Sequence, residues 1–166
     1  MSASEATTQD AKIEHGECVA DVAKEIFSTV CGVELEIRGD EDANQDGVVI
    51  ALISIVGDID WSIFMGLPRE TAVKVAAQFA GFEIPFDSED MGDAVGELTN
   101  VFGGQVKAAL DQRGVSGELS LPTVIRADSM KMLIQRAATG VTTYFDSPLG
   151  SLWTGVIMGK DAAGEK

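Results

Sequence analysis

The stretch of residues 93–110 constrains the fold most, because its pattern predicts an amphipathic α-helix with two faces of opposite character. At about 100° per residue, one narrow wedge collects polar or bare residues, namely Asp93, Glu97, Asn100 and Gly104. The opposite wall is apolar and consists of Val95, Leu98, Phe102, Val106 and Ala109. One face therefore suits a hydrophobic core, whereas the other carries a carboxylate one turn away from a carboxamide.

Three glycines weaken this predicted helix. A glycine in a helix interior costs roughly 0.5–1 kcal/mol relative to alanine, so Gly96, Gly103 and Gly104 together forgo about 2–3 kcal/mol. Two explanations stay open. Small residues let a neighbouring element pack closely against the helix, or they leave its polar face accessible to another molecule.

Composition limits the domain organisation and the class of partner. The 166 residues are 45% hydrophobic, which is enough for one domain with its own core. We expect a disordered N-terminal tail over residues 1–10, a single domain over residues 11–158 and a flexible C-terminal tail over residues 159–166. The net charge of −15, without any Lys/Arg cluster, argues against nucleic acid and anionic membranes as partners. A basic or mixed-charge protein surface is the more natural partner.

The start of the chain and its few reactive residues exclude several kinds of site. Residues 1–10 lack the basic start and apolar stretch of a signal peptide, and no run is long enough to span a bilayer, so we expect a cytoplasmic protein. Cys18 and Cys31 lie 13 positions apart in one predicted helix, too far for a disulfide, and are expected to be reduced. His15 is the only histidine, which excludes a multi-histidine metal site, and we expect no metal or cofactor of the chain's own.

The hydrophobic periodicity predicts an α+β fold with a largely antiparallel sheet. Helices are expected over residues 11–31, from Pro68 to residue 80, and from a cap at Asp87 or Ser88 to about residue 113. Strands are expected over residues 33–37, 48–56 and 59–65, and residues 118–158 are predicted to be rich in strands. Turns are predicted at residues 127–129, 139–140 and 146–150.

Two motifs are incomplete. Residues 42–47 are similar to the first half of a calcium-binding loop, but Ile53 stands where that loop needs a bidentate acid. A polar hairpin turn is the preferred interpretation. The pair Gly103-Gly104 lies in a helical pattern and lacks the Lys-Ser/Thr of a phosphate-binding loop.

The chain also contains a short internal echo. Gly16-Glu17 opens the sequence Gly-Glu-Cys-Val-Ala, and Gly96-Glu97 opens Gly-Glu-Leu-Thr-Asn. If the echo reflects a duplication, the first copy has kept the Gly and Glu but carries Ala20 where the second carries Asn100.

The order of Asp93, Glu97 and Asn100, followed by Pro122, resembles the signature of the CheC/CheX/FliY family of response-regulator phosphatases. Residues 66–72 and 119–124 are also similar to the CheX branch, and the resemblance covers residues 17–158. It implies a pseudo-symmetric, CheX-like α+β fold, in which long helices pack against a largely antiparallel sheet.

The resemblance implies a protein phosphatase that acts on the aspartyl phosphate of a phosphorylated CheY-type receiver domain. By position, Asn100 would orient the attacking water and Glu97 would dock to a lysine of the receiver. The partner-docking face would add Asp93, Gly96, Gly103 and Gly104. Magnesium would belong to the receiver. CheX-type members carry one such site, and the resemblance also implies that they form homodimers through their sheets. We therefore expect one site and a homodimer.

Two other hypotheses remain. The chain could be a non-catalytic CheX-like interaction module, which binds a receiver or a flagellar-switch-like partner without hydrolysis. It could also be a structural domain whose glycines only serve packing. The sequence names neither the cognate receiver nor the pathway, which is chemotaxis or another two-component circuit.

Overall fold

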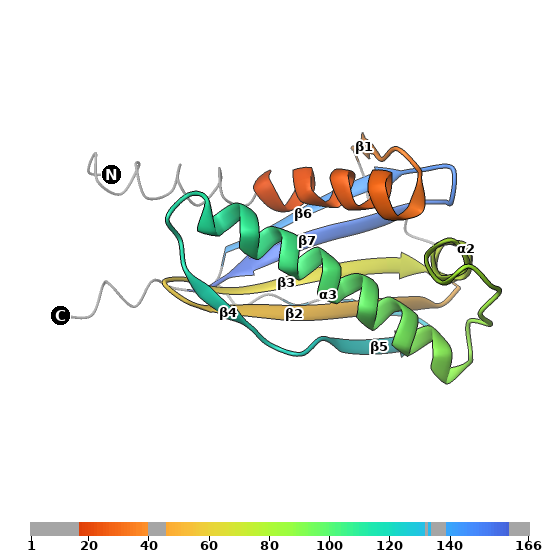
Figure 1. Cartoon of the computed structure of the whole chain (residues 1–166). Helices are drawn as coiled ribbons and strands as arrows, with labels where there is room; N and C mark the ends of the chain where they lie inside the picture. The colour runs from red at the N-terminus through yellow and green to blue at the C-terminus, as the bar shows by residue number, and fades with distance from the viewer. Residues whose placement is uncertain (1–16, 40–45, 132, 134–138, 160–166) are drawn as a thin grey trace.

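The computed structural model describes residues 17–39, 46–131, 133 and 139–159, and it places helices on one face of a single sheet (Figure 1). The two predicted tails lie outside the described residues, except Gly159, whose N–H donates to the Asp60 carbonyl at 2.9 Å. His15 and residues 42–45 of the half calcium loop also lie outside them. Within the described part of the chain, no helix is long and apolar enough to cross a membrane.

The helical segments follow the predicted order. Residues 17–26 form an α-helix that continues into a π-helical turn, η1 (Phe27–Cys31), and we call residues 17–31 the first helix. The other helices are α2 (Arg69–Ala80) and α3 (Glu89–Asp111). The strands are β1 (Glu36–Arg38), β2 (Val48–Gly57), β3 (Asp60–Pro68), β4 (Gly117–Leu119), β5 (Thr123–Ala127), β6 (Thr139–Asp146) and β7 (Leu152–Met158).

Proline and glycine set the limits of two helices where the sequence predicts them. Pro68 directly precedes α2, where a missing N–H does no harm. Gly81 ends α2 in the left-handed conformation, at φ 83°, and its N–H donates to the Ala77 carbonyl. Gly32 ends the first helix in the same conformation, at φ 68°. These local signals explain why the helix boundaries were predictable.

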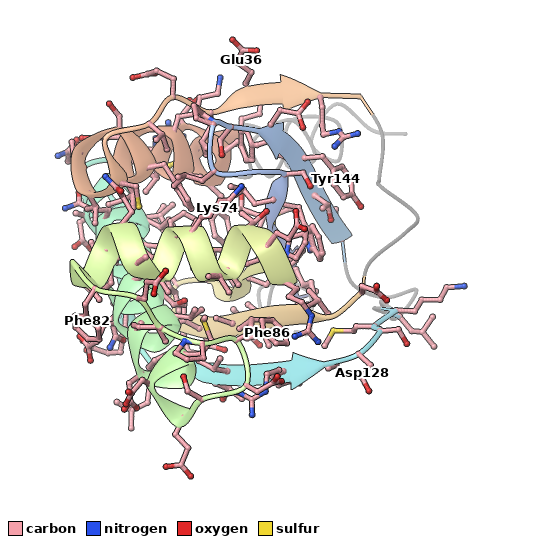
Figure 2. All side chains as sticks on the ribbon, turned by 90° about the vertical axis from the view of Figure 1, so that its right-hand side faces the viewer. Glu36, Lys74, Phe82, Phe86, Asp128 and Tyr144 are labelled. Carbon is pink, nitrogen blue, oxygen red and sulfur yellow. The ribbon has the colours of Figure 1, made fainter. Side chains whose placement is uncertain are left out.

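The core lies between the helices and one face of the sheet, and Figure 2 shows the helices gathered to one side of the strands. Each layer contributes fully buried side chains, such as Phe27 from the first helix, Phe102 from α3 and Met65 from β3. The predicted apolar wall of α3 is buried, and only Ala109 in it is half-exposed. Apolar burial of this kind is what fixes α3 against the sheet.

The sheet is antiparallel and pseudo-symmetric, as the resemblance implies. Its strand order is β1-β6-β7-β3-β2-β4, and β5 also pairs with β2. The hairpins β2–β3 and β6–β7 lie side by side through the pairing of β3 with β7. The strand that follows each long helix lies at an outer edge, and it pairs with the hairpin of the other half: β1 with β6, and β4 with β2.

The two long helices have the same burial pattern. Residues 17–26 and residues 97–106 agree at every position in being buried, half-buried or exposed. The match aligns Glu17 with Glu97 and Ala20 with Asn100. This agreement, together with the strand order, supports the internal echo read from the sequence.

The structure corrects the expectation of a hairpin between the strand at residues 33–37 and the strand at residues 48–56. The predicted strand over residues 33–37 begins later, at Glu36, and it pairs with β6 rather than with β2. The strands before and after residues 40–47, β1 and β2, therefore lie apart in the sheet and are not paired with each other as a hairpin. Partner choice between distant strands leaves no local trace in the sequence, which is why the periodicity could not reveal it.

Two smaller predictions also need correction. Gly140 was expected in a turn, but it lies within β6 opposite Ile157. Ser88 stands at the N-cap of α3 as predicted, but its hydroxyl donates to the Pro85 carbonyl at 2.7 Å rather than capping the helix. The turns at residues 127–129 and 146–150 follow β5 and β6 as expected.

The two cysteines are free and buried in the core under the first helix. Burial raises the pKa of both thiols, and at Cys18 the nearby Arg113 partly offsets that rise while Asp21 adds to it. The thiols therefore act as small apolar groups in the core.

Candidate functional site

The polar wedge predicted for the central helix faces solvent in α3. Asp93 and Glu97 are exposed, and Asn100 and Gly104 are half-exposed, so the four form a continuous strip along the helix. We call these residues the α3 strip. The structure therefore brings together the two residues that the sequence assigns to chemistry, one turn apart on one exposed face.

The side chains of Glu97 and Asn100 are not engaged by the described part of the fold, where neither forms a hydrogen bond or an ion pair. The neighbouring Thr99 behaves differently, because it is buried and its hydroxyl donates to the Val95 carbonyl at 2.7 Å. The carboxylate and the carboxamide on the α3 strip thus keep their full capacity to bind another molecule.

The glycines of α3 divide into two groups. At Gly104 an added Cβ would meet no atom within 4 Å, which leaves the strip bare there. At Gly103 it would lie 3.0 Å from two side-chain atoms of Ile53 and 3.3 Å from Leu119. Gly103 is therefore buried against the sheet and does not lie on the docking face, contrary to the prediction. Because glycine has no side chain, α3 can approach β2 closely at this point.

Gly96 needs the same correction. It is buried, and its missing Cβ would lie 3.6 Å from Val124 and 3.9 Å from Pro122, at ordinary contact distances. It therefore faces the segment that leads into β5 rather than solvent. Helical periodicity could not distinguish Gly96 and Gly103 from Gly104, because it does not show which neighbouring element packs against each side of the helix.

The segment that connects β4 to β5 runs along this flank of α3 (Figure 1). Ser120 fixes it to β2, since the Ser120 N–H donates to the Ser54 carbonyl and the Ser54 N–H donates to the Ser120 hydroxyl, both at 2.9 Å. The Ser120 hydroxyl in turn donates to the Leu121 carbonyl at 2.9 Å. The backbone beside the α3 strip is thus held by specific contacts.

The N-terminal end of α3 is held by a cation. The Arg126 guanidinium of β5 donates to the carbonyls of Phe86 and Ser88, at 3.0 and 2.9 Å. Beside it lies a cleft of about 310 Å³, which Gly92 helps to line, and an added Cβ at Gly92 would also meet nothing within 4 Å. Gly92 was not among the residues predicted from the sequence for the docking face.

The α3 strip lies outside the two clefts described for this fold. A second cleft, of about 440 Å³, lies at the start of α2 and is lined by Arg69, Lys74 and Ser151 among others. Neither cleft includes Glu97 or Asn100. Small molecules are usually bound in concave sites, whereas an exposed helix face suits a protein partner.

The charge of this helix face is negative at its N-terminal end. Glu89, Asp90, Asp93 and Glu97 contribute carboxylates, and the only lysine of α3, Lys107, pairs with Asp111 at 3.0 Å. Asn100 supplies a neutral group that both donates and accepts hydrogen bonds. Among the described residues, no group of three His, Cys, Asp or Glu side chains could hold a metal ion.

Comparison with known proteins identifies relatives of this chain. The profile of the family described as "Chemotaxis phosphatase CheX" matches residues 49–146, which is more than half of the chain. A curated relative, the CheY-P phosphatase CheX of Thermotoga maritima, is 31% identical over 85 residues. That match spans 51% of this chain and 55% of the relative, so about half of either protein is compared.

Solved structures show the same fold. A chemotaxis protein CheX from Desulfovibrio desulfuricans has a TM-score of 0.72 and 22% identity, covering 87% of this chain and 99% of that chain. A CheX-CheY-BeF3-Mg²⁺ complex from Borrelia burgdorferi has a TM-score of 0.70 and 20% identity, covering 87% and 97%.

Proposed function

The chain belongs to the CheX family of chemotaxis phosphatases, and from this we propose that it accelerates hydrolysis of the aspartyl phosphate of a CheY-type receiver domain. The observation that carries the proposal is the α3 strip, where the exposed Glu97 and the half-exposed Asn100 lie one turn apart and are unengaged by the described fold. The strip would lie over the phosphorylation pocket of the receiver.

Asn100 is the residue that we propose to act on the reaction itself. Phosphoryl transfer depends mainly on positioning and charge stabilisation, so a side chain that holds a water in line with the phosphorus is effective without covalent chemistry. A carboxamide suits this role, because it accepts a hydrogen bond from the water and adds no negative charge beside the phosphoryl oxygens. Its half-exposed position on α3 leaves it free to enter a partner's pocket.

Glu97 is proposed to dock rather than to catalyse. A carboxylate at its position would be repelled by the phosphoryl group but attracted by a lysine at the rim of the receiver pocket. It lies three residues before Asn100, on the same exposed side of α3, so a single approach of the partner can engage both side chains. Asp93, one turn further back, is proposed to border the same surface.

The partner is proposed by analogy with the Borrelia burgdorferi structure, which contains CheY, BeF3 and Mg²⁺ together with CheX. We propose that magnesium here also comes with the receiver, and that the chain itself needs no cofactor. A homodimer is proposed on the same family basis, and light scattering of the purified protein measures it.

The decisive experiment measures how long a phosphorylated CheY-type receiver of the same organism survives with and without this protein. We expect catalytic amounts of the protein to shorten that lifetime. Asn100→Ala should remove the effect, whereas Gln105→Ala, which truncates an exposed carboxamide elsewhere on α3, should retain it.

Two outcomes would contradict the proposal. If Asn100→Ala remains fully active, Asn100 does not orient the water. If the wild-type protein binds the phosphorylated receiver without shortening its lifetime, the chain is a non-catalytic interaction module.

A further inference from the structure

The segment between β4 and β5 presents an apolar side chain to solvent. Leu121 is 86% exposed, the largest fraction for any large apolar side chain among the described residues. Isolated exposed apolar residues are ordinary on protein surfaces. The significance of Leu121 therefore depends on where it lies and how firmly it is held.

The position of Leu121 relative to Asn100 follows from two contacts between its segment and α3. The side chain of Leu119 is 3.3 Å from the position of a Cβ on Gly103, and the ring of Pro122 is 3.9 Å from that of a Cβ on Gly96. Asn100 lies between these two glycines on the helix, and Leu121 lies between Leu119 and Pro122 on the segment. The two contacts therefore run the backbone at Leu121 along the stretch of α3 between Gly96 and Gly103, which includes Asn100.

The backbone at Leu121 is held on both sides. Its carbonyl accepts a hydrogen bond from the Ser120 hydroxyl, and Ser120 is itself bonded twice to Ser54 of β2. On the other side, Pro122 has a fixed φ and lies against α3. A side chain on such a backbone loses little backbone freedom when a partner covers it, which favours binding.

The α3 strip lacks a strong source of affinity. Exposed ion pairs contribute only about 0–1 kcal/mol, so contacts from Glu97 and Asp93 alone would hold a partner weakly. Stable interfaces obtain most of their affinity from a few well-buried apolar or aromatic groups surrounded by polar ones. Leu121 is the large exposed apolar side chain that lies beside the strip, and Val101, 37% exposed, is a smaller one on α3 itself.

We infer that Leu121 is the apolar anchor of the receiver interface, and that it packs against an apolar side chain on the rim of the receiver's phosphorylation pocket. The inference rests on the proposed function. A partner of standard interface size covers about 800 Å² of each protein, so a receiver centred on Asn100 must also cover the adjacent Leu121. Leu121 then determines affinity and the choice of receiver, while Asn100 acts on the phosphoryl group.

The test measures binding and turnover separately for Leu121→Ala. A CheY-type receiver of the same organism, loaded with BeF3 and Mg²⁺, reports the Kd, and the phosphorylated receiver reports kcat and KM. We expect Kd and KM to rise about 10-fold while kcat stays within about two-fold of wild type, as for a truncated interface anchor. Leu121→Met should keep near-wild-type binding, because it conserves volume and apolar character.

Val56→Ala is the control, used once light scattering shows that its oligomeric state matches wild type, since Val56 is a 55% exposed apolar residue on the face of the sheet away from α3. It should leave Kd, KM and kcat unchanged. Wild-type Kd for Leu121→Ala would overturn the inference, even if the protein is an active phosphatase. If the wild type binds without hydrolysis, the phosphatase proposal fails and Kd still decides the role of Leu121; if the wild type does not bind, both fail.

Discussion

The first helix and α3 share one burial pattern and differ in what their exposed positions carry. Residues 17–26 and 97–106 agree position by position, yet Ala20 stands where α3 has Asn100, and Lys24 stands where α3 has Gly104. The buried positions of both helices hold the same kind of apolar or small residue. The comparison teaches that the fold requires only the buried positions, so the proposed chemistry could change on one helix without altering the core.

The largest expected effect comes from moving the carboxamide between the helices. Asn100→Ala should lower stimulated dephosphorylation by about 100-fold or more, because the water loses its positioning group. Adding Ala20→Asn to Asn100→Ala should not restore activity, since Lys24 stands at the position where α3 has the bare Gly104 and brings a long charged side chain there. Receiver lifetime assays measure both variants. Restored activity in the double variant would show that the two helices are equivalent scaffolds.

The next effect concerns stability. Gly103→Ala should lower the free energy of unfolding by about 1 kcal/mol, because its Cβ would press on Ile53 at 3.0 Å and overpacking outweighs the gain in helix propensity. The corresponding residue of the first helix, Ala23, is fully buried and already carries a Cβ. Gly104→Ala should instead stabilise the protein by about 0.5–1 kcal/mol. Urea unfolding compares the two variants, and equal effects would contradict the division of the glycines.

Glu97→Ala tests the docking role. We expect KM to rise about 10-fold with little change in kcat, because a charged contact to the partner is lost while the water remains positioned. Glu17 occupies the matching exposed position on the first helix, so Glu17→Ala should change neither constant. A fall in kcat for Glu97→Ala, with KM unchanged, would move Glu97 from docking to catalysis.

The smallest effect involves the thiols of the first helix. One of them, Cys18, occupies the position equivalent to Leu98 of α3. Burial raises the pKa of Cys18 and Cys31 in the folded protein, so as pH rises past about 8.5 the unfolded thiols lose protons before the folded ones do. The unfolded state then binds fewer protons, and stability falls as pH rises. Urea unfolding at pH 8 and pH 10 should show a smaller decrease for the Cys18→Ala/Cys31→Ala variant than for wild type.

Much of the fold was predictable because its signals are local. The β-branched run of β2, the proline before α2 and the glycine after it each indicate an element or its boundary. The pairing of β1 with β6 was not predictable, since it joins residues that are far apart in the sequence. Gly140 illustrates a further limit, because glycine favours turns locally but here lies within a strand.

The candidate site divides in the same way. The exposure of Asp93, Glu97 and Asn100 follows from helical periodicity alone, and the structure agrees with it. The burial of Gly103 depends on how closely α3 approaches β2. Helical periodicity gives no information on that distance. Leu121 could not be predicted as a site residue, because a single leucine in a loop carries no periodic signal. Its position near the Asn100 stretch of α3 results from tertiary packing.

The exchange of edge strands also affects how the protein folds. The two edge pairings join residues as distant as Glu36 and Asp146, or Ile55 and Leu119, so neither half completes its sheet without the other. Contacts of such large sequence separation slow folding, but they also make the two halves unfold as one cooperative unit. A chain cut between α2 and α3 would accordingly give two fragments that each lack an edge strand and can regain it only by reassociating.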